Sequence, residues 1–345
     1  MERHGLGRRR EEGLGGEPRA SRAYHRSVTD HEELRFRAGN ASLGATLALP
    51  AADGRLPWVL LVPSWLPRNR DGGWDRGGHP GWFAAAATRD GLFSRLADAL
   101  AERDVASLRY DPRGCGDSDG AWEETALFTR IDDARDAIGA MRSRPELDLR
   151  RTAIVGHGEG AGIALSVAIG DPAIGAVGLI GASARSLRTV LRRGASERAR
   201  LGTDHEHPIV AALDGRFEEL IERAGRGEAS ITLDVAGEAV MLDLSAWDQG
   251  FHTPPIALAT MLHRNVVMLH GGADAWADPA EGRLLAASLA DAGNQPNLTV
   301  VEGAGHDLAE AGDADMGAFV DALIARMEPR DLPPVLVAIE EMGRA

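Results

Sequence analysis

Lysine is absent from the sequence, so every basic side chain other than histidine is an arginine. Together the aspartates and glutamates number 52, and the formal net charge is −14 at pH 7. A surface with this excess of negative charge repels phosphate groups, so we expect neither nucleic acid nor an anionic membrane as the main partner. The Ala-, Gly- and Arg-rich composition is typical of a GC-rich genome and by itself predicts no function.

Cysteine is also scarce: Cys115 is the single one, which excludes an internal disulfide. No apolar run approaches the length of a membrane span. Residues 1–28 are dominated by Gly, Arg and Glu and lack the apolar stretch of a secretory signal, so we expect a disordered tail there. These features predict a cytoplasmic protein and leave its oligomeric state open.

Strand-like and helix-like segments alternate along most of the chain. Short apolar runs predict buried strands at 58–63, 105–110, 151–155, 173–181, 265–271 and 297–303. Helical periodicity falls between or after them, at 92–104, 128–144, 159–170, 280–292 and 315–327. Such alternation predicts an α/β fold with a mostly parallel, doubly wound sheet, preceded here by a strand pair at 31–36 and 41–50.

The alternation is interrupted over residues 185–262, which are charged, irregular and favour helices. An insertion late in a doubly wound sheet is typical of a cap over the carboxyl ends of the strands, where ligands of such sheets bind. We therefore expect a core made of 29–184 and 263–330, a helical cap over 185–262, and a C-terminal extension over 331–345.

The segment AIVGHGEGAG, residues 153–162, carries the strongest chemical signal. It has the strand–turn–helix pattern of a nucleophile elbow, G-x-S-x-G, but Gly158 stands where the pattern has serine. The central residue of this turn has a strained backbone, and the next N–H, that of Glu159, would face a developing oxyanion. Glycine has no Cβ to clash, so we expect the turn to form without supplying a hydroxyl nucleophile.

An acid and a histidine follow the elbow in the chain order that this arrangement requires. Asp274 comes just after the strand at 265–271, and His306 just after the strand at 297–303. A second oxyanion donor would come from the turn after the strand at 58–63, where Ser64 and Trp65 follow Pro63, a residue without an N–H. The sequence therefore predicts a site formed by Gly158, Asp274 and His306, with backbone donors at Glu159, Ser64 and Trp65.

These segments resemble the α/β-hydrolase superfamily, and more narrowly its bacterial esterases and its serine-aminopeptidase-like and dienelactone-hydrolase-like members. The most specific motifs are DPRGCGDSDG, similar to D-x-R-G-x-G-x-S, and GHGEGA, similar to G-H-S-E-G-[GA]. The resemblance spans about residues 32–328 apart from the cap. It implies a serine nucleophile, a histidine base and an acid, which fall on Gly158, His306 and Asp274, and the first position is a departure.

Gly158 leaves several functions open. In the first alternative, the protein is a ligand-binding pseudoenzyme. In the second, His306 and Asp274 act as a general base on water or on a substrate proton. Alternatively, another residue is the nucleophile, for which Ser64 and Cys115 are the candidates, or a serine hydrolase has been inactivated by deliberate replacement of its serine. A nucleotide-binding glycine loop fits GHGEGA less well, because the next strand ends without the acid that would hold a ribose.

The expected ligand is a small, moderately apolar acyl compound, an ester or an amide. Apolar residues of the cap, Trp247 and Phe251, are candidates for the substrate pocket. No motif calls for a cofactor or a metal ion.

Overall fold

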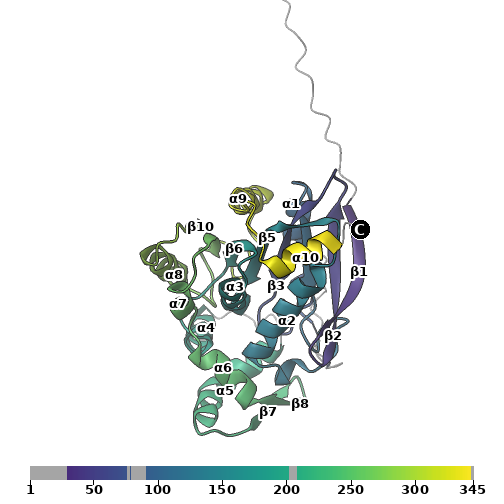
Figure 1. Cartoon of the computed structure of the whole chain (residues 1–345). Helices are drawn as coiled ribbons and strands as arrows, with labels where there is room; N and C mark the ends of the chain where they lie inside the picture. Colours follow the sequence, from purple (N-terminus) through teal and green to yellow (C-terminus); the bar gives the residue numbers. More distant parts are fainter. Residues whose placement is uncertain (1–28, 76–77, 79–90, 202–207, 343–345) are drawn as a thin grey trace, which may run out of the picture.

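The core of the molecule is an eight-stranded sheet with the order β1-β2-β4-β3-β5-β6-β9-β10 (Figure 1). The computed structural model describes residues 29–75, 78, 91–201 and 208–342, so the tail predicted over 1–28 lies outside the described residues. The strands of the sheet are β1 (Thr29–Ala38), β2 (Ala41–Pro50), β3 (Leu56–Val62), β4 (Ala106–Tyr110), β5 (Leu147–His157), β6 (Ile174–Ile180), β9 (Asn265–Gly271) and β10 (Asn297–Val301).

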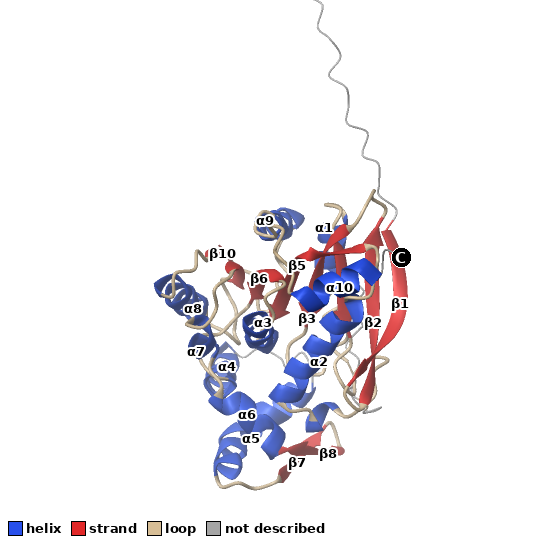
Figure 2. Ribbon diagram, in the orientation of Figure 1, coloured by secondary structure: helices blue, strands red, loops and turns tan. Residues whose placement is uncertain are grey.

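The sheet is mostly parallel. Only β2 runs antiparallel to its neighbours, β1 and β4, and all pairs from β4 to β10 are parallel. Every residue of β3 and β6 is buried, because helices cover both faces of the sheet there. Burial largely alternates along the edge strand β1, where one face meets solvent. The predicted doubly wound, mostly parallel sheet is therefore confirmed (Figure 2).

Helices cover both faces of the sheet. One face is covered by α1 (Leu92–Ala101) and α9 (Asp313–Ile324), and the other by α2 (Leu127–Met141), α3 (Glu159–Gly170) and α8 (Pro279–Asp291). Asp278 caps α8: its carboxylate accepts the Ala280 N–H at 2.6 Å, directly before Pro279. Within the described ranges, no helix is both long and apolar enough to cross a bilayer.

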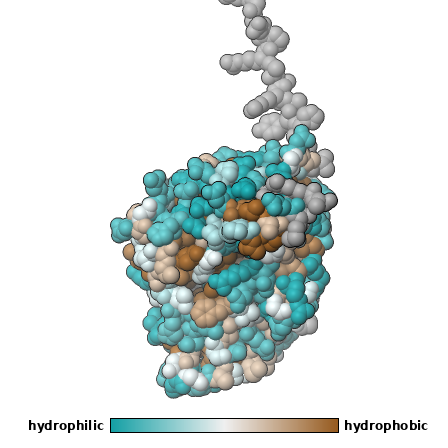
Figure 3. Space-filling view, in the orientation of Figure 1, coloured by the Kyte–Doolittle hydropathy of each residue, from teal (hydrophilic) through white to brown (hydrophobic). Residues whose placement is uncertain are grey.

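The segment after residue 330 forms α10 (Pro334–Met342). Leu332 and Leu336 bury themselves against Leu149 and Ala173 of the core. Figure 3 shows apolar side chains at the surface in the region of α10, where Val335 is 65% exposed.

Between β6 and β9 the chain leaves the sheet and builds a separate layer at the lower end of Figure 1. It contains α4 (Leu187–Leu201), α5 (Pro208–Gly225), β7 (Ser230–Val235), β8 (Glu238–Asp243), α6 (Leu244–His252) and α7 (Pro255–Ala259). The hairpin of β7 and β8 is a finding that helical patterning did not predict. It turns on Ala236 and Gly237, both at positive φ, and Ala-Gly is a weak turn signal in a sequence.

Three tryptophans join this layer to the core. Trp65 stacks on Trp122 of the short helix η1 (Trp122–Glu124) and meets Trp247 of α6 edge-on, with ring centroids 4.8 Å apart for the latter pair. The indole N–H of Trp122 donates to the Trp65 carbonyl oxygen at 2.6 Å. Because all three rings are buried, they fix the layer over the carboxyl ends of the strands.

Charged side chains of the DPRGCGDSDG motif connect it to neighbouring segments of the core. Asp111 accepts hydrogen bonds from the backbone N–H and the guanidinium of Arg70, a buried pair. Arg113 pairs with Asp133 of α2 at 2.7 Å. These paired charges satisfy one another inside the protein, so the motif supports the fold rather than reaching the ligand.

Candidate active site

The predicted elbow connects β5 to α3 at the centre of the sheet. Gly158 has φ +57° and ψ −119°. This conformation is strained for any residue that has a Cβ, whereas glycine adopts it freely. Its N–H donates to the Ile180 carbonyl at 2.9 Å, which ties the turn to the neighbouring strand. A Cβ on Gly156 would lie 2.0 Å from the Gly160 carbonyl oxygen, so only glycine allows β5 and α3 to approach this closely.

Loops after two neighbouring strands bring Asp274 and His306 together. The Nδ1–H of His306 donates to Asp274 Oδ2 at 2.8 Å. The other carboxylate oxygen accepts the backbone N–H groups of Trp276 at 2.8 Å and Ala277 at 2.9 Å. The carboxylate is thereby held in one orientation and fixes the tautomer and the orientation of the imidazole.

Burial and charge act in opposite directions on this pair. Burial disfavours the carboxylate form of Asp274, but the attraction and hydrogen bond of His306 outweigh it, and the pKa of Asp274 lies below its usual value. Burial likewise disfavours protonated His306, but the charge and hydrogen bond of Asp274, helped by Asp307, raise the pKa of His306 above its usual value. Such a shift is typical of a histidine base supported by a carboxylate.

The free ring nitrogen of His306 faces the elbow. A Cβ built on Gly158 would lie 3.1 Å from His306 Nε2. Gly181, at the end of β6, makes room for the ring, because a Cβ there would lie 3.1 Å from both His306 Cε1 and Nδ1. The structure thus brings together the three predicted positions Gly158, His306 and Asp274.

His157, directly before the elbow, supports His306 from below. Its Nε2–H donates to the His306 carbonyl at 3.1 Å, and the two rings lie 4.5 Å apart. Burial, together with the nearby His306, lowers the pKa of His157 to about 3, so this ring is neutral near pH 7. Beside it, Asp307 pairs with buried Arg68 at 2.9 Å.

The turn after β3 lies against the elbow. Val62 is paired with Gly156 across the parallel strands β3 and β5, so residues two positions further along each strand come side by side. Ser64 Oγ accordingly lies 2.8 Å from the position of a Cβ on Gly158. Ser64 and Trp65 both line the pocket, as does Glu159, the residue after the elbow.

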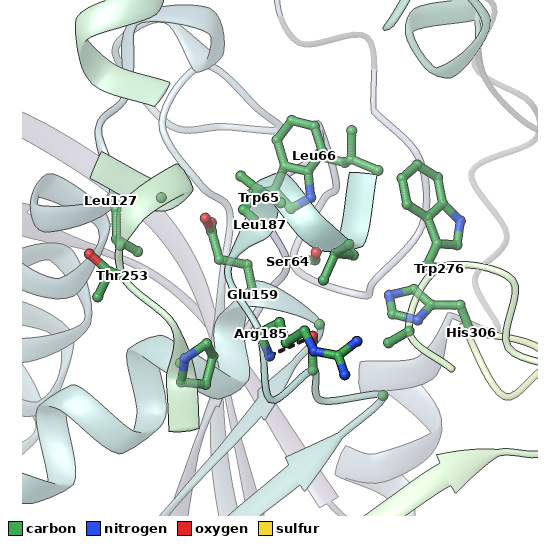
Figure 4. Close-up of a pocket in the computed structure, with 18 of the residues that line it drawn as sticks. Ser64, Trp65, Leu66, Leu127, Glu159, Arg185, Leu187, Thr253, Trp276 and His306 are labelled. Atoms are coloured by element: carbon green, nitrogen blue, oxygen red, sulfur yellow. Dashed lines mark hydrogen bonds between the residues drawn. The ribbon is translucent and has the colours of Figure 1, made fainter. Parts of the chain in front are cut away.

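A pocket opens above Gly158, with about 750 Å³ of empty space including its open mouth (Figure 4). Ser64, Gly158, His306, Arg185 and Trp276 are among the residues that line it. The layer between β6 and β9 contributes Leu187, Val190, Gly250, Thr253, Pro255 and Leu258. Carbon-rich walls with a few polar groups suit a small, largely apolar ligand.

Two predicted pocket residues need separate comment. Trp247 does not line this pocket; it lies behind Trp65 and borders a smaller cavity of about 200 Å³. The sequence shows that Trp247 is apolar but not that Trp65 stands in front of it. The side chain of Phe251 lies outside the described residues.

Charges inside the pocket are paired. The Glu159 carboxylate, buried at the wall, binds Arg130 of α2 at 2.7 Å. Burial raises the pKa of Glu159, and Arg130 offsets part of that effect. Arg185 binds Glu281 at 2.6 Å. Within the described ranges, no group of three His, Cys, Asp or Glu side chains is placed to hold a metal ion.

Cys115 lies away from the pocket walls and is 1% exposed. Burial, with repulsion from Asp75 and Asp111, raises the pKa of its thiol well above the usual value. A thiol that stays protonated and unexposed is a poor nucleophile, which removes the structural basis for Cys115 as a candidate.

Sequence reasoning missed part of the support around His306. Arg68 stacks on Trp74 with its guanidinium carbon 3.7 Å from the ring centroid, and reaches Asp307 across more than two hundred residues. No local pattern marks Arg68, which follows β3 in a long polar loop. The closeness of Ser64 to Gly158 could have been inferred only from the pairing register of β3 and β5.

Comparisons with known proteins agree with this architecture. The sequence matches the model of a family described as "Alpha/beta hydrolase family" over residues 59–322. Similar solved structures include Est1E from Butyrivibrio proteoclasticus with bound ferulic acid (14% identity, TM-score 0.60, 85% of this chain and 99% of that one). An esterase from Pyrococcus furiosus (14% identity, TM-score 0.57) covers 86% of this chain and is itself covered to 92%.

A third similar structure is that of DcsB in complex with its substrate analogue (14% identity, TM-score 0.59, 86% of this chain and 100% of that one). At such identities the likeness shows the fold alone. No curated protein sequence matches the chain.

Proposed function

Because this chain belongs to the alpha/beta hydrolase family, we propose that it hydrolyses a small, moderately apolar ester or amide with His306 as the general base. One observation carries the proposal: His306 is hydrogen-bonded to Asp274 through Nδ1, while its Nε2 faces the pocket floor at Gly158. The solved structures of an esterase and of Est1E with ferulic acid support acyl compounds as the substrate class.

The chemistry follows from the two ring nitrogens. Since Nδ1–H is held by Asp274, the lone pair of Nε2 is free to take a proton from a hydroxyl group that attacks a bound carbonyl carbon. Asp274 then stabilises the imidazolium that forms, and His306 returns the proton to the leaving group. In this mechanism the N–H of Glu159, at the positive end of α3, stabilises the oxyanion, with Ser64 or Trp65 as the second backbone donor.

Gly158 bears on which hydroxyl attacks. Residue 158 has no hydroxyl, so the acyl-enzyme of a conventional serine hydrolase cannot form at the elbow. The proposal therefore requires attack by water or by a hydroxyl from another part of the pocket. His306 serves as base in either case.

A second candidate is a ligand-binding protein without catalysis. It is favoured by Gly158 and by the turn Pro63–Ser64–Trp65, in which Pro63 has no N–H to donate. In that case His306 and Asp274 would contribute to ligand binding only.

Hydrolysis of p-nitrophenyl esters from acetate to octanoate tests the proposal. We expect turnover that falls by about 100-fold or more in His306→Ala, the usual loss for a missing general base, and that persists in Ser196→Ala on the surface of α4. A native protein that binds the matching carboxylic acids, and binds them more weakly without His306, yet hydrolyses none of the esters would instead support the binding protein.

A further inference from the structure

Resting on the proposed function, the geometry points to Ser64 as the hydroxyl that His306 activates, so that the acyl group is carried on Ser64 rather than on the elbow. This assigns a covalent step to the turn after β3. Ser64 follows β3 and the elbow follows β5, and these two strands are immediate neighbours in the parallel sheet.

Ser64 and His306 converge on one point. The position of a Cβ on Gly158 lies 2.8 Å from Ser64 Oγ, 3.4 Å from Ser64 Cβ and 3.1 Å from His306 Nε2. The Ser64 side chain and the His306 ring therefore both border the space that a side chain of residue 158 would enter. Rotation about one side-chain bond moves the hydroxyl within this space, and catalytic hydrogen bonds often tighten only when substrate is bound.

Other nucleophiles in and around the pocket are engaged or inaccessible. Ser166 donates to the Gly162 carbonyl at 3.0 Å, and Ser183 donates to Glu281 at 3.3 Å. Cys115 is buried away from the pocket, and the chain has no lysine. Among the described residues, Ser64 Oγ has no hydrogen-bond partner, and Ser64 lines the pocket (Figure 4).

The glycine at 158 and the serine at 64 are sterically linked. A Cβ at residue 158 would approach Ser64 Oγ to 2.8 Å, closer than real Cβ atoms come to their neighbours. A side chain at 158 therefore forces the Ser64 hydroxyl out of its present position. Glycine at residue 158 requires no such shift of the Ser64 hydroxyl.

The reaction balances with groups present in the site. Ser64 Oγ bonds to the carbonyl carbon while His306 Nε2 takes its proton; the C–O bond of the ester breaks, and His306 gives that proton to the leaving alkoxide. Water then attacks the acyl–Ser64 ester, His306 accepts a proton from it and passes it to Ser64 Oγ, and the acid leaves. The uncapped first turn of α3 supplies N–H donors for both oxyanions.

Covalent labelling tests the assignment without depending on the natural substrate. The protein is treated with an alkyl fluorophosphonate, and the adduct is weighed intact and located by peptide mass spectrometry. We expect one adduct, on Ser64. It should be absent from Ser64→Ala, form at least 100-fold more slowly in His306→Ala, and form at the native rate in Ser196→Ala. Locating the adduct in the native protein needs no variant to fold.

A rescue variant gives a second, independent readout. In Gly158→Ser combined with Ser64→Ala the steric conflict is removed and a hydroxyl stands at the elbow. We expect Ser64→Ala to lose ester hydrolysis. The double variant should hydrolyse the ester at least tenfold faster than Ser64→Ala, with the adduct moved to residue 158.

The outcomes separate this inference from the proposed function. Native ester hydrolysis that needs His306 but survives in Ser64→Ala would overturn the role of Ser64 and leave His306 as a base acting on water. An adduct on any other residue, or none at all, would also overturn it. Absence of ester hydrolysis in the native protein would count against the proposed function itself, whatever residue the probe labels.

Discussion

His306 Nε2 lies 3.1 Å from the place that a Cβ would occupy on Gly158. The histidine is thus positioned for a nucleophile at residue 158, and that residue has no side chain. His306 is held there by its hydrogen bond to buried Asp274, at 2.8 Å. The predictions below ask what this histidine does and what holds it in place.

Asp274→Asn should lower kcat/KM for ester hydrolysis by about 10³- to 10⁴-fold, because an amide can hold His306 in the wrong tautomer and cannot stabilise the imidazolium. Steady-state kinetics on p-nitrophenyl esters measures this. The matched control is Asp278→Asn, four residues on, where asparagine can still cap α8. Equal losses in both variants would show that Asp274 has no special role.

The pH profile of kcat/KM should fall on the acid side through a pKa above 6.5, the usual value for histidine. His306 acts as a base only when neutral, and Asp274 raises its pKa by stabilising the protonated form. Profiles from pH 5 to 9 measure the inflection in the native protein and in Asp274→Asn, where it should move to lower pH. An inflection that is the same in both proteins would argue against His306 as the titrating base.

His157 should make the protein less stable in acid. Its folded-state pKa is about 3, against 6.5 for a free histidine, so below pH 6.5 the unfolded chain binds a proton that the folded protein excludes. The stability that neutral His157 contributes is present above pH 6.5 and is lost as the pH falls. Between pH 6.5 and 5 this effect lowers the free energy of unfolding by about 2 kcal/mol.

Urea unfolding of the native protein and of His157→Gln at pH 6.5 and 5 tests this. The variant should lose about 2 kcal/mol less than the native protein over that interval. His252→Gln on the exposed side of α6 serves as control and should behave like the native protein. Parallel losses in all three proteins would show that His157 is not the group responsible.

Gly181→Ala should lower the rate of ester hydrolysis by about tenfold or more, because the new methyl group displaces His306. A catalytic group that is misplaced by about 1 Å can lose this much rate or more. The added Cβ would lie 3.1 Å from the ring at Nδ1, the atom bonded to Asp274. Both kcat and thermal stability should be measured.

Gly293→Ala is the matched control for that experiment. Gly293 also has a positive φ, but a Cβ there would meet nothing within 4 Å. The free energy of unfolding of this variant should fall by a similar amount, about 1–3 kcal/mol, because of backbone strain, while its activity is kept. Loss of activity in both variants would point to general destabilisation instead of a displaced histidine.

Much of the fold could be predicted from the order of apolar runs. The segments 159–170 and 265–271 coincide with α3 and β9 as they stand, and other elements differ by a few residues at their ends. β5 extends four residues further towards its N-terminus than its apolar run, because Leu147 and Leu149 alternate with polar residues before that run begins. The hairpin β7–β8 was missed, since its Ala-Gly turn carries little signal.

The sequence alone determined the elements, their alternation, and the residues Gly158, Asp274 and His306, because hydrophobic period and strand-end position are local properties. Only the tertiary structure decided that Ser64 borders Gly158, that Trp247 lies behind Trp65, and that Arg68 supports the His306 loop through Asp307. Those relations depend on strand register and on contacts between segments far apart in the chain. Distances between such segments are set by the packing of the whole sheet and its cap, which no local pattern encodes.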